Sequence, residues 1–142
     1  MKKLVMMFIV SCLMMMCSVC LASNDHKDLA KQQQVVEKFM DVFDGEPIPA
    51  YAQVSAGFSV EMKKAITEYV FAELQKQARV KFGTMNEAKL VTFQRSDKGD
   101  RLTYFASFSK ENNVRMVFAF DKQNKLMDFA FTPIKQVAGK NK

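Results

Sequence analysis

Histidine and cysteine, the residues that most often carry nucleophilic catalysis and transition-metal binding, are scarce in this sequence. The chain has one histidine, His26, and its three cysteines, Cys12, Cys17 and Cys20, all lie near the N-terminus. The rest of the chain therefore offers no Ser/His/Asp or Cys/His arrangement and no cluster with metal-ligand spacing. We expect no metal, no cofactor and no disulfide in the folded domain, and we interpret His26 as part of a frayed end.

The cysteines belong to an apolar N-terminal stretch with the features of an export signal. Two lysines precede an apolar run from Leu4 to Leu21, and Cys20 and Ala22 provide the small residues that cleavage after Ala22 requires. We therefore expect residues 1–22 to be a signal peptide and the protein to be exported, to the periplasm or beyond it. Two alternatives remain open. The run is close to the ~20 residues of a membrane anchor, and Cys17 or Cys20 could carry a lipid, although neither follows a small residue.

Cleavage would leave a chain with a mild basic excess and the length of one domain. Without Lys2 and Lys3 the basic residues number 21 − 2 = 19 against 15 acidic ones, and the length becomes 142 − 22 = 120 residues. A chain of this size suits one domain, which we place at residues 23–134, followed by a basic, flexible tail at 135–142. Neither an Arg-rich helix nor an alternating Lys/aromatic strip occurs, so nucleic acid is not an expected partner. After cleavage no stable membrane span is expected either.

An amphipathic helix is expected at the start of the domain. Between Asp28 and Phe43 apolar residues recur at intervals of three and four, as they do on one face of a helix. Asn24 or Asp25 would cap this helix. Pro47 would end it, because proline disfavours helical geometry in the residue before it.

A second helix is expected between Ser59, as the N-cap, and Gly83. A short helical turn that opens at Pro49 and stops before Gly57 would precede it. The apolar stripe of the second helix consists of Met62, Ile66, Tyr69, Val70, Leu74 and Ala78.

After residue 83 the apolar period changes to two, which is typical of half-buried strands. Four such stretches occur, at 87–95, 102–109, 114–120 and 127–132. The facing of the first stays open, because Val91 and Phe93 compete with Ala88 and Leu90. The connections are too short for the crossover that parallel strands need. The sequence therefore predicts an α+β fold in which two N-terminal helices pack on a four-stranded antiparallel meander.

Phe-Ala-Phe occurs in both of the last two strands and sets their expected register. A two-residue turn at 123–124 would place Phe118 opposite Phe129 and Phe120 opposite Met127. A three-residue loop would instead place Phe118 beside an aspartate, so the pattern favours the even-length loop. The same reasoning places Ala106 opposite Phe118 in the preceding hairpin. One face of the sheet would then be lined by large apolar side chains and would meet the helices.

Several segments together resemble a known family. They are Phe-Met-Asp-Val-Phe-Asp-Gly at 39–45, the helix capped by Ser59, Lys-Phe-Gly at 81–83 and Val-Phe-Ala-Phe-Asp-Lys-Gln-Asn-Lys-Leu at 117–126. They are similar to a bacterial domain of unknown function with a cystatin-like α+β roll, which occurs in exported proteins and sometimes ahead of an α/β-hydrolase domain. The resemblance spans 30–133, although Gln123 and Asn124 stand where such domains have Asp-Gly. The sequence includes no hydrolase domain, so the resemblance implies no activity.

The first functional hypothesis is a binding module that uses the sheet face away from the helices. Small residues beside an aromatic one would form a shallow apolar patch with a polar rim there, and such patches often mark contact sites. The partner would be a second copy or another exported protein. The residues expected to make this contact are Phe105, Arg115, Val117, Ala119, Asp128 and Ala130.

The second hypothesis is an enzyme of the isomerase or cyclase type, because the wider fold, shared with nuclear-transport-factor-like proteins, includes enzymes with an acid or base in a cone between sheet and helices. Tyr69 and Tyr104 are the hydroxyls expected to reach this cone, but tyrosine is a weak proton-transfer group near neutral pH. Asp128 or Glu73 facing an open cavity would favour the enzyme. A cone filled by Phe and Met would favour the binding module, and we expect no catalytic residue.

Overall fold

The computed structural model describes residues 26–45 and 47–135 of the 142-residue chain. The signal peptide expected at 1–22, the cap expected at Asn24 or Asp25 and the tail after residue 135 lie outside the described residues. Within the described ranges, no helix combines the length and the apolar character that crossing a membrane requires.

Four helices precede the sheet in the part of the chain that the structure describes, where two were expected. A helix over residues 26–40, which we call the N-terminal helix, corresponds to the first prediction. It is followed by α2 (Tyr51–Ser55), α3 (Val60–Ala65) and α4 (Glu68–Phe82). The short helical turn expected after Pro49 is confirmed as α2.

The second long helix is broken at Ile66 and Thr67. Ser59 caps α3 as predicted, because its hydroxyl accepts a hydrogen bond of 3.1 Å from the Met62 N–H. Ile66 then leaves the helical range with φ −109° and ψ 81°, and its carbonyl accepts a hydrogen bond from the Tyr51 hydroxyl. Thr67 caps a new helix, α4, with its own side chain. The prediction of one continuous helix is therefore wrong, and the break changes which side of α4 faces the sheet.

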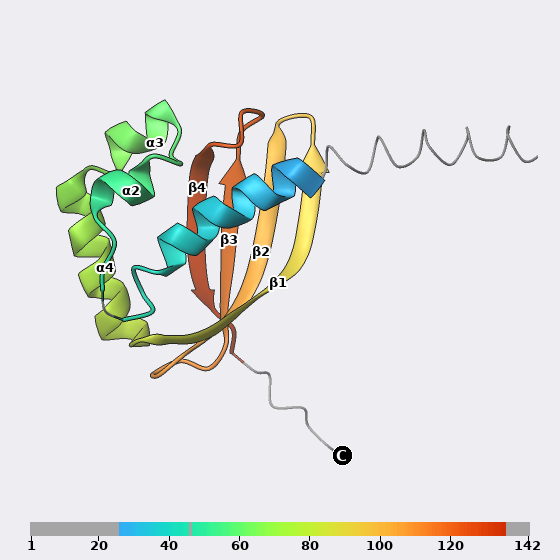
Figure 1. Cartoon of the computed structure of the whole chain (residues 1–142). Helices are drawn as coiled ribbons and strands as arrows, with labels where there is room; N and C mark the ends of the chain where they lie inside the picture. The colour runs from blue at the N-terminus through green and yellow to red at the C-terminus, as the bar shows by residue number, and fades with distance from the viewer. Residues whose placement is uncertain (1–25, 46, 136–142) are drawn as a thin grey trace, which may run out of the picture.

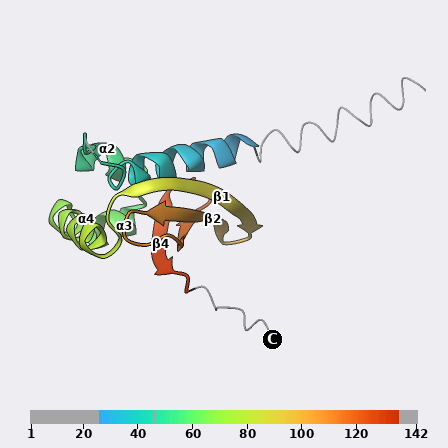
Figure 2. The same ribbon diagram turned by 90° about the horizontal axis from the view of Figure 1, so that it is seen from below.

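The predicted antiparallel meander is confirmed. Strands β1 (Met85–Ser96), β2 (Gly99–Phe108), β3 (Val114–Phe120) and β4 (Leu126–Pro133) form one sheet in the order β1-β2-β3-β4. The N-terminal helix crosses this sheet, and α2, α3 and α4 gather beside β4 (Figure 1). Seen from below, the N-terminal helix lies on one side of the sheet and the described helices leave the other side uncovered (Figure 2). We call the covered side the inner face and the opposite side the outer face.

A β-bulge in β1 settles the facing that the sequence left open. The register with β2 shifts between Leu90 and Thr92, so β1 carries one extra residue at Val91. As a result Ala88, Leu90 and Phe93 all pack against the core. Val91 is 51% exposed. A strict alternation could not have placed both Leu90 and Phe93 on one face, because an extra residue is needed to change the parity.

The turn between β3 and β4 has three residues rather than the expected two. The Asp121 N–H donates to the Lys125 carbonyl at 2.9 Å, and Asn124 adopts a left-handed backbone with φ 59°. The carboxylate of Asp121 accepts hydrogen bonds of 2.9 Å from the N–H groups of both Gln123 and Lys125. These bonds stabilise the odd-length turn that the hydrophobic pattern had disfavoured.

A second bulge, in β4, compensates for the odd-length turn. Phe120 lies opposite Leu126, and Met127 is the extra residue before the regular pairing resumes. The pairing of Phe118 with Phe129 is therefore confirmed, whereas the pairing of Phe120 with Met127 is wrong. Leu126 is fully buried and Met127 is 42% exposed, because the bulge exchanges their faces.

The hairpin of β2 and β3 is shifted along the strands relative to the prediction. Ala106 lies opposite Val114 instead of Phe118, and Phe118 lies opposite Leu102. The reason is a longer connection at 109–113, within which the Phe108 N–H donates to a loop carbonyl at 2.8 Å. The shift is an even number of residues, so each side chain keeps the face that was expected for it.

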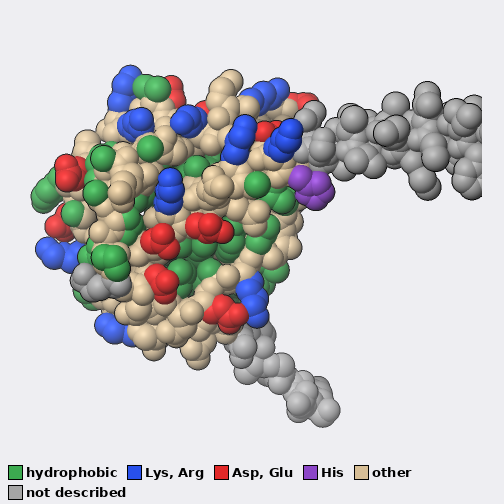
Figure 3. All heavy atoms as spheres, viewed as in Figure 1, with side chains coloured by type: hydrophobic (Ala, Val, Ile, Leu, Met, Phe, Trp, Pro, Cys, Tyr) green, Lys and Arg blue, Asp and Glu red, His purple; other side chains and the backbone are tan. Residues whose placement is uncertain are grey.

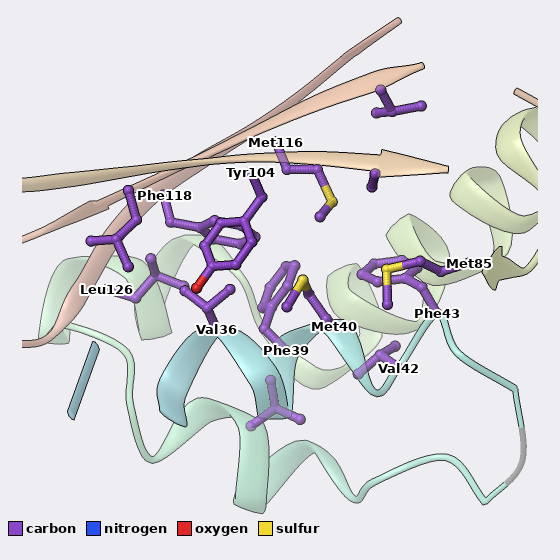
Figure 4. Packing of buried hydrophobic residues seen from close by; sticks show 14 of the residues in the cluster. Val36, Phe39, Met40, Val42, Phe43, Met85, Tyr104, Met116, Phe118 and Leu126 are labelled. Atoms are coloured by element: carbon purple, nitrogen blue, oxygen red, sulfur yellow. The ribbon is translucent and has the colours of Figure 1, made fainter. Parts of the chain in front are cut away.

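Phe39 of the N-terminal helix is the centre of the aromatic core. Its ring centroid lies 4.7 Å from that of Phe129 and 5.6 Å from that of Phe118. Phe39 and Met40 point from the helix toward Tyr104 and Phe118 of the sheet (Figure 4). Four further rings lie around Phe39, those of Phe43, Phe58, Phe71 and Phe131.

Candidate functional site

The outer face brings the six predicted contact residues together in three adjacent rows. Read across β2, β3 and β4, the first row is Phe105, Arg115 and Thr132, the middle row is Thr103, Val117 and Ala130, and the third row is Arg101, Ala119 and Asp128. Phe105 is 48% exposed, which is high for a phenylalanine. The middle row is uncharged, whereas the first and third rows carry arginine or aspartate.

The charges on the outer face differ in how firmly they are held. Lys89 of β1 lies beside Phe105 and forms an ion pair of 2.9 Å with Glu87. The Asp128 carboxylate accepts a hydrogen bond of 2.8 Å from the Phe129 N–H. Arginine and aspartate at opposite ends of the third row give this row a positive and a negative end.

The inner face is filled by side chains where an enzyme of this shape would need an open cone. Met116, Phe118 and Phe108 are fully buried. Tyr104 is buried as well, in contact with the Phe118 ring, and burial raises the pKa of its hydroxyl, an effect that a hydrogen bond with Gln33 partly offsets. A buried tyrosine that is harder to ionise is a poor general base.

Tyr69, the other expected cavity residue, does not reach the interior. It is 75% exposed on the first turn of α4. The break at residues 66–67 turns this side of α4 outward, and Phe71 and Phe82 are the buried residues of the helix instead. Glu73 also lies on α4, where its carboxylate is 3.6 Å from the Lys76 ammonium.

A closed ring of polar side chains lies at the start of the N-terminal helix and was not anticipated from the sequence. Gln32, fully buried, donates from its amide nitrogen to Asp100 at 2.8 Å and to Asn124 at 2.7 Å. Asn124 donates to Asp28 at 3.0 Å, and Arg95 lies between the Asp28 and Asp100 carboxylates at 3.2 and 3.0 Å. We call these five residues the polar ring. It joins the helix, β1, β2 and the β3–β4 turn.

The polar ring acts on the charge states of its members and on the geometry of the helix. The hydrogen bond from Asn124, and then the interactions with Arg95, lower the pKa of Asp28, although desolvation opposes them. The carbonyl oxygen of Gln32 has no hydrogen-bond partner within the described residues. We interpret the ring as a structural clamp, since buried polar networks fix orientation when their members are paired.

Two hollows complete the surface. The first, between α4 and β4, has a volume of ≈ 240 Å³ and is lined mainly by aromatic side chains. The second, between the N-terminal helix, α2 and the β3–β4 turn, is lined by Lys31, Lys38 and Lys125 and by no acidic residue. Lys and Arg side chains gather along the upper border of this side of the molecule (Figure 3). This basic border attracts anions without selecting among them.

Comparison of the chain with models of protein families, with characterised proteins and with solved structures finds no match in any of the three.

Proposed function

We propose that the protein is an exported, non-catalytic binding module that associates with a second copy of itself through the outer face of its sheet. The observation that supports this most is the contrast between the two faces. The inner face is filled by fully buried aromatic and methionine side chains, whereas the outer face keeps Phe105 48% exposed among small residues. An exposed apolar patch with a polar rim is typical of a contact surface.

The alternative function, an enzyme of the isomerase or cyclase type, gains no support from the same residues. Such an enzyme needs an acid or a base that faces an open cone. Asp128 lies on the outer face, and Glu73 is paired with Lys76 along α4. The filled inner face therefore favours the binding module.

The pattern of the outer face is self-complementary about its middle row. With a two-fold axis along that row, the first row of one copy would lie over the third row of the other. Arg115 would then face the small Ala119 of the second copy and reach toward its Asp128. Phe105 would face Arg101 of the second copy, a pairing that cation–π attraction favours. Every such contact would occur twice, as in other isologous interfaces.

The size of the face sets the expected affinity. Four strands about 4.8 Å apart span about 19 Å, and the seven residues of β3 at about 3.4 Å each span about 24 Å. The resulting flat area of about 450 Å² per copy is below the roughly 800 Å² of a standard interface. We therefore expect a weak dimer with a micromolar or higher dissociation constant.

Sedimentation equilibrium, from micromolar to millimolar protein, tests the proposal. Wild type should dimerise, and Ala119→Arg should be monomeric because the new arginine would face Arg115 of the second copy. A change of unfolding free energy within about 0.5 kcal/mol would show that the variant still folds. Ala72→Arg, on an exposed position of α4, is the matched control and should dimerise normally. A monomeric wild type, or an Ala119→Arg protein that dimerises as wild type does, would contradict the proposal.

Export and the cystatin-like roll belong to the same proposal. The apolar run from Leu4 to Leu21 and the small residues before position 23 support export, and the resemblance of segments such as 39–45 and 117–126 supports the roll and the link to exported bacterial domains. Intact mass spectrometry of the full chain expressed in a bacterium should show loss of residues 1–22. A retained leader or a lipid on Cys20 would contradict this cleavage.

A further inference from the structure

The hollow between α4 and β4 exposes aromatic surface that the rest of the inner face conceals. Phe129 and Phe131 of β4 are only half-buried, whereas their cross-strand partners, Phe118 and Met116, are fully buried. The side chains that line the hollow opposite β4 come mainly from α4 and the N-terminal helix. They include Phe39, Phe43, Phe71, Leu74, Ala78 and Phe82.

The edge of β4 beside this hollow is closed to an added strand. The Leu126 N–H and carbonyl already bond to Gly57 and Ser59 of the same chain, at 2.7 and 2.8 Å. The Phe129 N–H is held by the carboxylate of Asp128, and Pro133 has no N–H to donate. Charged groups and proline on an edge strand are devices that prevent strand addition. An extended peptide is therefore a poor occupant of the hollow, and a small molecule is a better one.

The charge of the lining selects the sign of the occupant. Lys81 is the only charged residue that lines the hollow, and no carboxylate does so. Its ammonium lies 5.2 Å from the centroid of the Phe82 ring, at the rim formed by the last turn of α4. Arg79, on the same last turn, adds a second positive charge nearby. A ligand with an apolar body and an anionic head would complement both parts.

We propose that this hollow binds a single-chain amphiphile with a carboxylate head, the class to which fatty acids belong. The chain would lie among the rings of Phe39, Phe71 and Phe129, and the carboxylate would lie at Lys81. The volume of ≈ 240 Å³ exceeds the roughly 150 Å³ of an apolar cavity that takes benzene. Such a site is independent of the association through the outer face, because Ala130 is the only residue of the three rows that lines it.

Calorimetric titration of the domain with three ligands of equal chain length tests the proposal. Sodium octanoate should bind more tightly than 1-octanol, and octylammonium should bind most weakly, all below their aggregation concentrations. Ala78→Phe, which fills the hollow from the middle of α4, should abolish binding of octanoate and octanol alike. Failure of octanoate to bind wild type at millimolar concentration, or equal affinity for octanoate and octylammonium, would overturn the proposal.

Substitution at the rim separates the head-group contact from a loss of fold. Lys81→Gln should weaken octanoate binding about threefold, as expected for a solvent-exposed ion pair, and leave octanol binding unchanged. Lys76→Gln lies on the same helix outside the lining and should bind all three ligands as wild type does. If Lys81→Gln binds octanoate as tightly as Lys76→Gln, the carboxylate does not lie at Lys81 and the assignment fails.

Discussion

The side-chain amide of Gln32 donates a hydrogen bond of 2.8 Å to the carboxylate of Asp100, and both residues are buried. The bond spans 68 positions of the sequence and joins the N-terminal helix to the first turn of β2. Arg95 donates two hydrogen bonds to the same carboxylate, of 3.0 and 3.1 Å. The polar ring thus holds one end of the helix on the sheet, and the rings around Phe39 hold the other.

Gln32→Ala should lower the unfolding free energy by about 1 to 3 kcal/mol, because it removes both donors from buried acceptors. Gln34→Ala, on the exposed side of the same helix, should change it by no more than about 0.5 kcal/mol. Urea unfolding of the two variants gives the comparison. Equal losses would show that the ring contributes nothing beyond the helix itself.

The acid side of the stability curve should depend on Asn124. Its amide is the largest influence that lowers the pKa of Asp28. Since the folded pKa lies below the unfolded one, the carboxylate stabilises the fold above the unfolded pKa, and this contribution is lost as pH falls through the folded pKa. Asn124→Gly keeps the left-handed backbone but removes the amide. It should raise the Asp28 pKa toward the ordinary value of about 3.9 and move acid unfolding to higher pH. An unchanged carboxyl titration in NMR spectra would refute this.

Phe118→Ala should cost about 3 to 5 kcal/mol of unfolding free energy, as expected for a fully buried aromatic residue. Phe129→Ala should cost less, about 1 to 3 kcal/mol, because its ring is half-buried beside the hollow. Denaturant unfolding measures both losses. A larger loss for Phe129 than for Phe118 would mean that the hollow is closed in solution.

The bulge in β4 predicts opposite effects for two adjacent residues. Leu126→Ala should cost about 2 to 5 kcal/mol, whereas Met127→Ala should change stability by less than about 1 kcal/mol. The sequence pattern alone predicts the reverse order, because it places Met127 opposite Phe120. Thermal unfolding of the two variants, side by side, distinguishes these registers.

The antiparallel meander and the Ser59 cap could be predicted because their signals are local. Short polar turns and a hydroxyl before a helical stripe act within a few residues. The break at Ile66 and Thr67 had a local signal too, a β-branched pair whose second member is a good N-cap. The expected apolar stripe continued through Ile66, however, and this continuity concealed the break.

The two bulges could not be predicted from the alternation of residues. In β1 both Leu90 and Val91 are apolar, and only packing against the N-terminal helix decides which of them turns inward. The polar ring was missed for a similar reason. Asp28 and Asn124 are 96 positions apart, and each has an ordinary local role at a helix start or in a turn. Only the folded chain places them side by side.

The bonds of Leu126 to Gly57 and Ser59, and the contact of the Phe39 ring with Phe129, make the early part of the chain depend on the last strand. A ribosome completes β4 only near the end of synthesis, so the apolar stripe of the N-terminal helix has no sheet edge to close against until almost the whole chain has emerged. Domains generally fold as units, and this one lacks a smaller unit that could close first. A nascent chain of this sequence therefore stays open long enough to be threaded through a translocation channel before it folds.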